Sequence, residues 1–217
     1  MRRIPILFGF CCLAMLVLAG NAPALGSKGG PELGVPSSPV YKNNGSVVRT
    51  MALAGNGPAL KLLSAPVDTC TGADDPNASV VAQEQAMECM INFARQQAGL
   101  PKLVDSGRLD GSADSKAGDI LRCNQFSHEA CGRDFLFWFR RAGYLTGHCW
   151  WAGENLAWGT GSLGSVRSIA RAWLHSPSHR ANILGGEYTE FGLSLRVGSL
   201  SGAPDAHVWV NHFGNHC

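Results

Sequence analysis

Cysteine is the residue type that most constrains how this chain can fold. Six of its eight cysteines lie between Cys70 and Cys217, and the other two belong to an apolar segment near the start. An even number of cysteines in an exported chain indicates disulfide bonds. Structural zinc is the alternative, but the chain has no C-x-x-C pair to supply its ligands. We therefore predict a domain braced by disulfides, provided that the chain is exported.

The first residues predict that export. Residues 1–3 form a short basic start, residues 4–19 are apolar and uncharged, and Ala22-Pro23-Ala24 follows as a small-residue cleavage pattern. This layout is typical of a secretory signal peptide, which we place at residues 1–26. A membrane anchor is the alternative, but an anchor needs about 20 apolar residues and this run is shorter. We expect no membrane span once the signal is removed.

Removal of the signal also changes the charge of the chain. The formal net charge of +2 falls to zero when Arg2 and Arg3 leave, because no acidic residue leaves with them. Nucleic acids and anionic membranes both select a basic surface. We therefore expect neither as a partner.

The rest of the chain divides into a linker and one domain. Residues 27–72 contain many Gly, Pro, Ser and Asn residues and show no sustained hydrophobic period, which favours a flexible linker. Residues 73–217 are enough for one domain with one core. We expect this domain to be a monomer.

Hydrophobic spacing in the domain predicts helices mixed with short strands. The predicted helices cover residues 80–98, 106–122, 134–141 and 165–174, and a further short helix begins at Pro177. The predicted strands cover residues 150–158, 191–197 and 207–213. This mixture lacks the regular alternation of a β-α-β protein. It indicates an α+β fold with a small antiparallel sheet.

Six short segments then follow one another in a recognisable order. They are MINFAR at 90–95, FSH at 126–128, GENLA at 153–157, AWLHSPSHRANIL at 172–184, YTEFG at 188–192 and VWVNHFG at 208–214. Together they resemble the signature of the CAP superfamily, the cysteine-rich secretory, antigen 5 and pathogenesis-related-1 family. The fourth segment is similar to the version found in the family's bacterial branch. The resemblance covers the domain and none of the linker.

The resemblance implies a three-layer α–β–α sandwich with a central antiparallel sheet. It also implies a cleft lined by two histidines and two glutamates, of which His128 and Glu154 match the family directly. At the other two positions a serine replaces the family's glutamate, and a glutamate replaces its histidine. We predict that His179 and Glu187 complete the set in swapped order. Glu190 is the rival of Glu187.

Three kinds of chemistry fit this set of side chains. Two imidazoles and two carboxylates suit a borderline divalent cation such as Zn²⁺, with His128 and His179 as nitrogen ligands. The same groups could instead form a hydrogen-bonded cluster that holds helices to the sheet. A hydrolase using His128 and Glu154 is the third hypothesis, although neither Ser127 nor Ser178 lies in a Gly-x-Ser-x-Gly turn.

The pairing of the cysteines is a hypothesis about which segments need tying together. We pair Cys70 with Cys89, Cys123 with Cys131, and Cys149 with Cys217. The first bond would tie the incoming segment to the first helix, the second would close the loop of His128, and the third would pin the C-terminus. Each bond could stabilise the fold by about 2–4 kcal/mol.

These observations favour a secreted or cell-envelope protein whose CAP-like domain binds a ligand in its cleft. The ligand would be a divalent cation, a lipid or another envelope component. A non-catalytic interaction domain is the first alternative and the hydrolase is the second. His212, in the last predicted strand, could also face the cleft, although we first interpret it as a structural residue.

Overall fold

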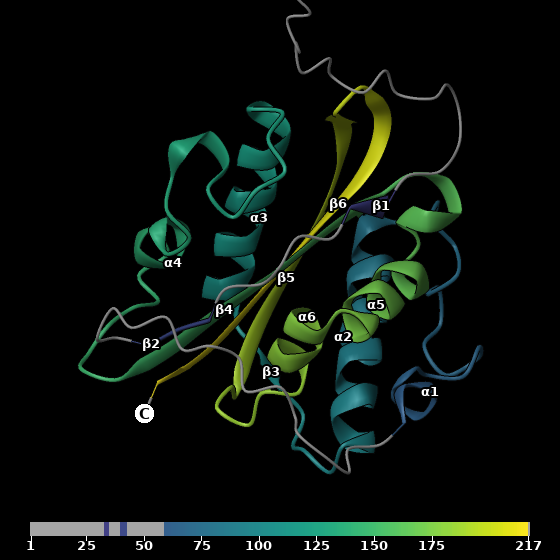
Figure 1. The fold of residues 1–217 in the computed structure, drawn as a ribbon, viewed down its shortest axis with the longest axis horizontal. Helices are drawn as coiled ribbons and strands as arrows, with labels where there is room; N and C mark the ends of the chain where they lie inside the picture. Colours follow the sequence, from purple (N-terminus) through teal and green to yellow (C-terminus); the bar gives the residue numbers. More distant parts are fainter. Residues whose placement is uncertain (1–32, 35–39, 43–58, 217) are drawn as a thin grey trace, which may run out of the picture.

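The computed structural model describes residues 33–34, 40–42 and 59–216, so the predicted signal peptide 1–26 lies outside it (Figure 1). A sheet lies between two layers of helices. Helices α3 (Gly107–Arg122) and α4 (Phe137–Arg141) form one layer. The other layer contains α1 (Leu60–Leu63), α2 (Val80–Gln97), α5 (Val166–His175) and α6 (Pro177–Ile183). The predicted three-layer sandwich is confirmed.

The described residues contribute six strands to the sheet. The strands are β1 (Leu33–Gly34), β2 (Val40–Lys42), β3 (Val104–Asp105), β4 (Trp150–Gly159), β5 (Glu190–Leu200) and β6 (Ala203–His216). Their order is β1-β4-β6-β5-β3, and β2 also pairs with β4. Every pair is antiparallel except β3 with β5, which is parallel. The sheet is therefore mixed, whereas we predicted an antiparallel one. The sequence did not reveal β3, because a strand of two residues is too short to show an alternation of apolar and polar residues.

The helices form where their sequences favour helix starts and apolar stripes. Ser79 caps α2 by accepting a hydrogen bond from the backbone N–H of Ala82. Pro177 occupies the first turn of α6, where its missing N–H costs nothing. Helix α4 begins three residues later than predicted, because Asp134 accepts the N–H of Leu136 and forms a turn first. Two short 3₁₀ helices, Ala130–Gly132 and Gly161–Gly164, complete the described helices.

The main core lies between the sheet and the α2–α5 layer. Leu63, Ala65 and Cys70 are buried in it with residues of α2 such as Met87 and Met90. The folded unit therefore takes in part of the segment 27–72 that we interpreted as a linker, and β1 and β2 also belong to that segment. Among the helices of the described ranges, none has both the length and the apolar character needed to cross a membrane.

Helix α3 approaches the sheet closely at one point. A Cβ atom at Gly192 of β5 would lie 2.2 Å from the backbone carbonyl carbon of Leu109, which is too close for any side chain. The absence of a Cβ therefore lets the helix backbone rest on the strand. This contact places the polar residues of the following turns of α3 over β6 and β4.

Candidate functional site

Glu154 of β4 lies at the centre of a buried polar cluster. Its Oε1 is 2.6 Å from Nδ1 of His128, and its Oε2 is 2.7 Å from Nε2 of His212 on β6. Burial alone would raise the pKa of this carboxyl, but the Lys116 ammonium and the two imidazoles lower it to about 2. Glu154 is therefore a carboxylate at any ordinary pH, and both of its oxygens are engaged.

Helix α3 supplies two further members of the cluster. The ammonium of the buried Lys116 donates to the backbone carbonyl of His128 and lies 3.9 Å from Oε1 of Glu154. Oγ of Ser112 is 2.9 Å from Nδ1 of His212. Burial lowers the pKa of His212, so its imidazole is neutral and acts as a link between Ser112 and Glu154. One charged pair, the carboxylate and the ammonium, thus sits in a network of hydrogen bonds.

His179 reaches the site from α6, in the opposite helical layer. Its Nδ1 is 2.7 Å from Oγ of Ser176, whereas its buried Nε2 forms no hydrogen bond of ordinary distance and angle among the described residues. Burial, followed by the electrostatic effect of His128, lowers the pKa of His179 to about 3, against an opposing effect of the Leu156 backbone. The two imidazoles therefore interact electrostatically across the site, and the imidazole of His179 is neutral.

The structure brings together three of the four predicted residues and places the fourth elsewhere. His128 and Glu154 are in contact, and His179 is within electrostatic reach of His128. Glu187 lies in the loop after α6, where its charge acts on Arg95. The side-chain partners of Glu154 in the described part of the chain are two histidines and a lysine, so Glu187 is not joined to it. Its rival, Glu190, accepts the hydroxyl of Tyr144 at 2.5 Å.

The sequence interpretation missed Lys116 and Ser112 altogether. Helix α3 buries Leu109, Ala113, Ala117 and Ile120, and Lys116 stands on this same apolar face, four residues before Ile120. A lysine in the middle of a buried stripe is a sign of a buried partner, since an unpaired ammonium is costly to bury. The lysine within this apolar stripe is the sequence feature that could have indicated the buried cluster.

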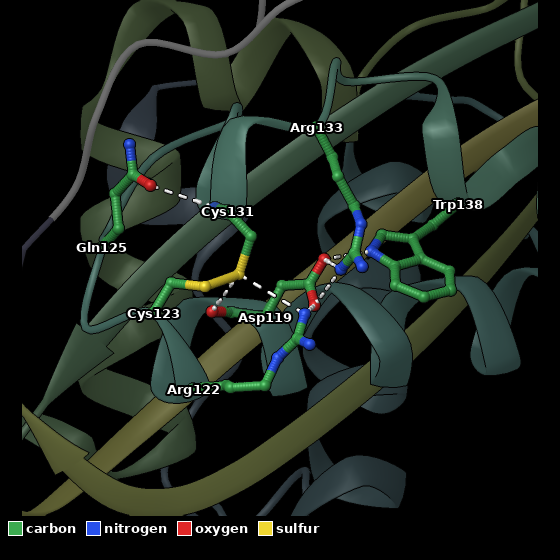
Figure 2. Close-up of a disulfide and its surroundings, with 7 residues drawn as sticks. All are labelled: Asp119, Arg122, Cys123, Gln125, Cys131, Arg133 and Trp138. Atoms are coloured by element: carbon green, nitrogen blue, oxygen red, sulfur yellow. Dashed lines mark hydrogen bonds and ion pairs between the residues drawn. A yellow bond between two sulfur atoms is a disulfide. The ribbon is translucent and has the colours of Figure 1, made fainter.

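A disulfide braces the loop that carries His128 (Figure 2). Cys123 and Cys131 are bonded across eight residues, and Gln125 Oε1 accepts the N–H of Cys131 at 3.0 Å inside the same loop. The predicted pair Cys70–Cys89 is also present. Both pairs confirm the prediction.

The third predicted disulfide cannot be followed to both ends. Cys149 is disulfide-bonded, but its predicted partner, Cys217, lies outside the described residues. The pairing of these two cysteines stays a prediction.

Comparison with known proteins agrees with the fold and the motifs. The model of the cysteine-rich secretory protein family (CAP) matches residues 89–213, which is more than half of the chain. The chain belongs to the CAP family. The CAP chain is also 30% identical over 165 residues to the uncharacterised protein YkwD of Bacillus subtilis. That match covers 75% of this chain but 58% of YkwD, so the chain spans less than two thirds of that relative.

Solved structures share the CAP fold at lower sequence identity. An extracellular protein of Bacillus anthracis that contains an SCP domain is 20% identical, with a TM-score of 0.50 over 61% of this chain and 40% of that one. An outer surface protein of Borrelia burgdorferi is 18% identical, with a TM-score of 0.54 over 64% of this chain and 96% of that one. At these identities the comparison shows a common fold.

The donor atoms of this CAP site limit what it can hold. Among the described residues, no group of three or more His, Cys, Asp or Glu side chains is arranged to hold a metal ion. Both oxygens of Glu154 are engaged by histidines, so this carboxylate orients His128 and is not itself available as a ligand. The imidazoles of His128 and His179 are the groups that could meet a cation.

Proposed function

We propose that this CAP domain is an extracellular binding module that takes a borderline divalent cation between His128 and His179. The observation that supports this most directly is Nε2 of His179, a buried nitrogen that forms no hydrogen bond of ordinary distance and angle among the described residues. A buried polar atom without a partner is costly and calls for an explanation. A cation would satisfy it.

Each imidazole is already oriented by its other nitrogen. Glu154 engages Nδ1 of His128, and carboxylate–histidine pairs of this kind are usual behind metal ligands. Ser176 engages Nδ1 of His179. The low pKa of His179 keeps its imidazole neutral, which is the form that binds metals.

The same donor set argues for a particular class of cation and a modest affinity. Imidazole nitrogens suit Zn²⁺ or Cu²⁺, whereas Ca²⁺ and Mg²⁺ prefer several oxygens. Two protein nitrogens leave other positions of the cation to water or to an external ligand, as in open sites. The module would then recognise a ligand through the cation.

Export is part of the proposal. The disulfides Cys70–Cys89 and Cys123–Cys131 suit an oxidising compartment. Proteins of the same fold are an extracellular protein and an outer surface protein. These features and the predicted signal peptide support a secreted or cell-envelope location.

The geometry favours binding over hydrolysis. A serine nucleophile needs an activating histidine within reach and access to a substrate. Ser112 and Ser176 each lie within hydrogen-bond distance of a histidine, His212 and His179. Both histidines are buried, and Ser112 is itself only 1% exposed, which favours a scaffold or binding role for these pairs over catalysis.

Isothermal titration of the oxidised protein with zinc chloride tests the proposal. We expect binding with a Kd on the order of 1–10 μM, weakened at least about tenfold in both His128→Ala and His179→Gln. His175→Ala is the matched control, because His175 is exposed at the end of α5, and it should bind as the wild type does. Circular dichroism would establish that each variant is folded. A wild type that binds no zinc at about 1 mM, or a control that loses as much affinity as the two variants, would rule the site out.

A further inference from the structure

A second cavity lies between α3 and α4, and none of its lining residues belongs to the histidine site. Its volume is about 410 Å³, within the range of about 300–1,000 Å³ that is usual for small-molecule sites. Gly107, Arg108 and Gly111 of α3 form one side, and Trp138 and Arg141 of α4 form the other. The two helices belong to the same layer (Figure 1).

The cavity is positively charged. Its lining residues in the described chain include two arginines and no carboxylate. Arg108 donates to the backbone carbonyl of Gly143 at 3.3 Å, which draws its guanidinium to the end of α4 where Arg141 stands. Neither arginine forms an ion pair with any of the described residues. The cavity thus has two guanidinium groups in its lining and no counter-charge among the described residues that line it.

Trp138 gives the cavity a fixed aromatic surface. Its indole Nε1 donates to Oδ2 of Asp119 at 2.8 Å, and the guanidinium of Arg133 lies 5.0 Å from the centre of its ring (Figure 2). Asp119 also accepts hydrogen bonds from Arg122 and Arg133, so its negative charge is neutralised behind the tryptophan. The ring is therefore oriented in advance, which lowers the entropic cost of stacking a ligand against it.

Gly111 gives the cavity a wall without side chains, and the protein itself does not need this glycine. Gly111 and Gly107 are absent from the residues with positive φ, and a Cβ at either position would meet no heavy atom within 4 Å. A glycine inside a helix costs about 0.5–1 kcal/mol relative to alanine. Neither backbone conformation nor internal packing explains why Gly111 stands there. Gly111 lines the cavity, and no side chain at this position narrows it.

We propose that this cavity binds an anionic saccharide, a sugar ring that carries a carboxylate or a phosphate. The anion would lie between Arg108 and Arg141, since guanidinium groups bind both kinds of oxyanion in a bidentate manner. The ring would lie against Trp138 and the bare backbone at Gly111. The proposal does not depend on the cation site, and either site can fail without the other.

Titration of the oxidised, ¹⁵N-labelled protein followed by NMR tests the proposal through the indole N–H signal of Trp138. The probes are glucuronic acid, glucose 6-phosphate and, as the neutral control, glucose. We expect a saturable shift with a Kd on the order of 1 mM for at least one of the two anions and no shift with glucose. The anion that binds more tightly identifies whether the ligand is a sugar acid or a sugar phosphate.

Three variants locate the binding. Arg108→Gln combined with Arg141→Gln should weaken binding at least about tenfold, because both charged contacts are removed. Gly111→Leu should abolish it by filling the cavity while the protein keeps its fold. Arg140→Gln is the matched control, since Arg140 lies on the same helix but pairs with Asp134 outside the cavity, and it should bind like the wild type. Failure of both anions to shift the signal at about 50 mM, equal binding of glucose, or unchanged binding by the double variant would each overturn the proposal.

Discussion

The two flanks of helix α3 carry opposite charges and use them differently. The flank toward α2 borders a hollow of about 530 Å³ whose lining includes five carboxylates. They belong to Glu84, Glu88, Asp105, Asp110 and Asp114. The flank toward α4 borders the cavity with two arginines. By charge alone, the acidic hollow would be the stronger candidate for a binding site.

The hydrogen bonds of the two flanks favour the arginine cavity as the binding site instead. Asp110 accepts the backbone N–H of Leu193 at 2.9 Å, and Glu84 accepts that of Leu195 at 2.9 Å. These N–H groups lie on the edge of β5 beyond its short pairing with β3, where strand partners are missing. These two carboxylates thus complete the sheet, and Asp114 pairs with Arg196, whereas neither arginine of the other flank forms an ion pair with a described residue. A group of like charges indicates a ligand only when the fold has not already engaged those charges.

The largest effect that we predict concerns the one carboxylate behind the basic cavity. Asp119→Ala removes the buried acceptor of Arg122, Arg133 and Trp138, and should lower the free energy of unfolding by about 2–3 kcal/mol. Urea denaturation measures it. Asp134→Asn, which removes an exposed ion pair but keeps an acceptor for the N–H of Leu136, is the control and should stay within about 0.5 kcal/mol of the wild type. A loss below about 0.5 kcal/mol for Asp119→Ala would show that the tryptophan is not held as described.

A smaller change in stability is expected when one variant from each flank is compared directly. Asp110→Ala leaves the N–H of Leu193 without its acceptor and should destabilise the protein by about 1–2 kcal/mol. Arg141→Gln should change stability by less than about 0.5 kcal/mol, because Arg141 contributes nothing to the described fold. Chemical denaturation of both variants side by side gives the answer. Equal losses in the two variants would break the distinction between engaged and available charges.

The smallest effect is a pH dependence. Burial raises the pKa of Asp110 to about 6, partly opposed by the hydrogen bond from Leu193. Between about pH 4 and pH 6 the folded state therefore binds more protons than the unfolded state, so the free energy of unfolding falls as pH rises through this window. Partial exposure limits the contribution of this group to about 1 kcal/mol.

Asp110→Asn isolates that contribution, since the amide keeps an acceptor for Leu193 and does not titrate. The variant should gain about 1 kcal/mol relative to the wild type between pH 4 and pH 7, measured by urea denaturation at each pH. The difference between the two proteins cancels the opposite trend of His179, whose lowered pKa makes stability fall in acid. A difference that stays constant with pH would contradict the raised pKa of Asp110.

Local patterns predicted the elements that are long enough to repeat. The helix predicted at 80–98 is α2, because its apolar residues recur at the helical period, and the predicted strand 150–158 is β4. In each of these segments the local sequence pattern is sufficient to identify the secondary structure. The motifs in fixed order then identified the family fold, including the layer of helices on each face.

The site was only partly predictable, because its members meet through contacts between distant segments. His128 and Glu154 stand in motifs and were found, whereas Lys116 belongs to no motif and its partners are 12 and 38 residues away along the chain. Glu187 was assigned by its position in a motif, yet the backbone turns its loop toward Arg95. Sequence position identified candidates, but only the packing of α3 on the sheet decided which of them touch.

The position of β6 has a consequence for how the chain folds during its synthesis. This strand lies between β4 and β5, so those two strands have no contact in the sheet without it. It is also the last of the described elements to leave the ribosome. A nascent chain that has reached residue 200 therefore cannot close its sheet, because non-local pairing must wait for the partner. Such a chain would complete its core late, which is compatible with the export before folding that we propose.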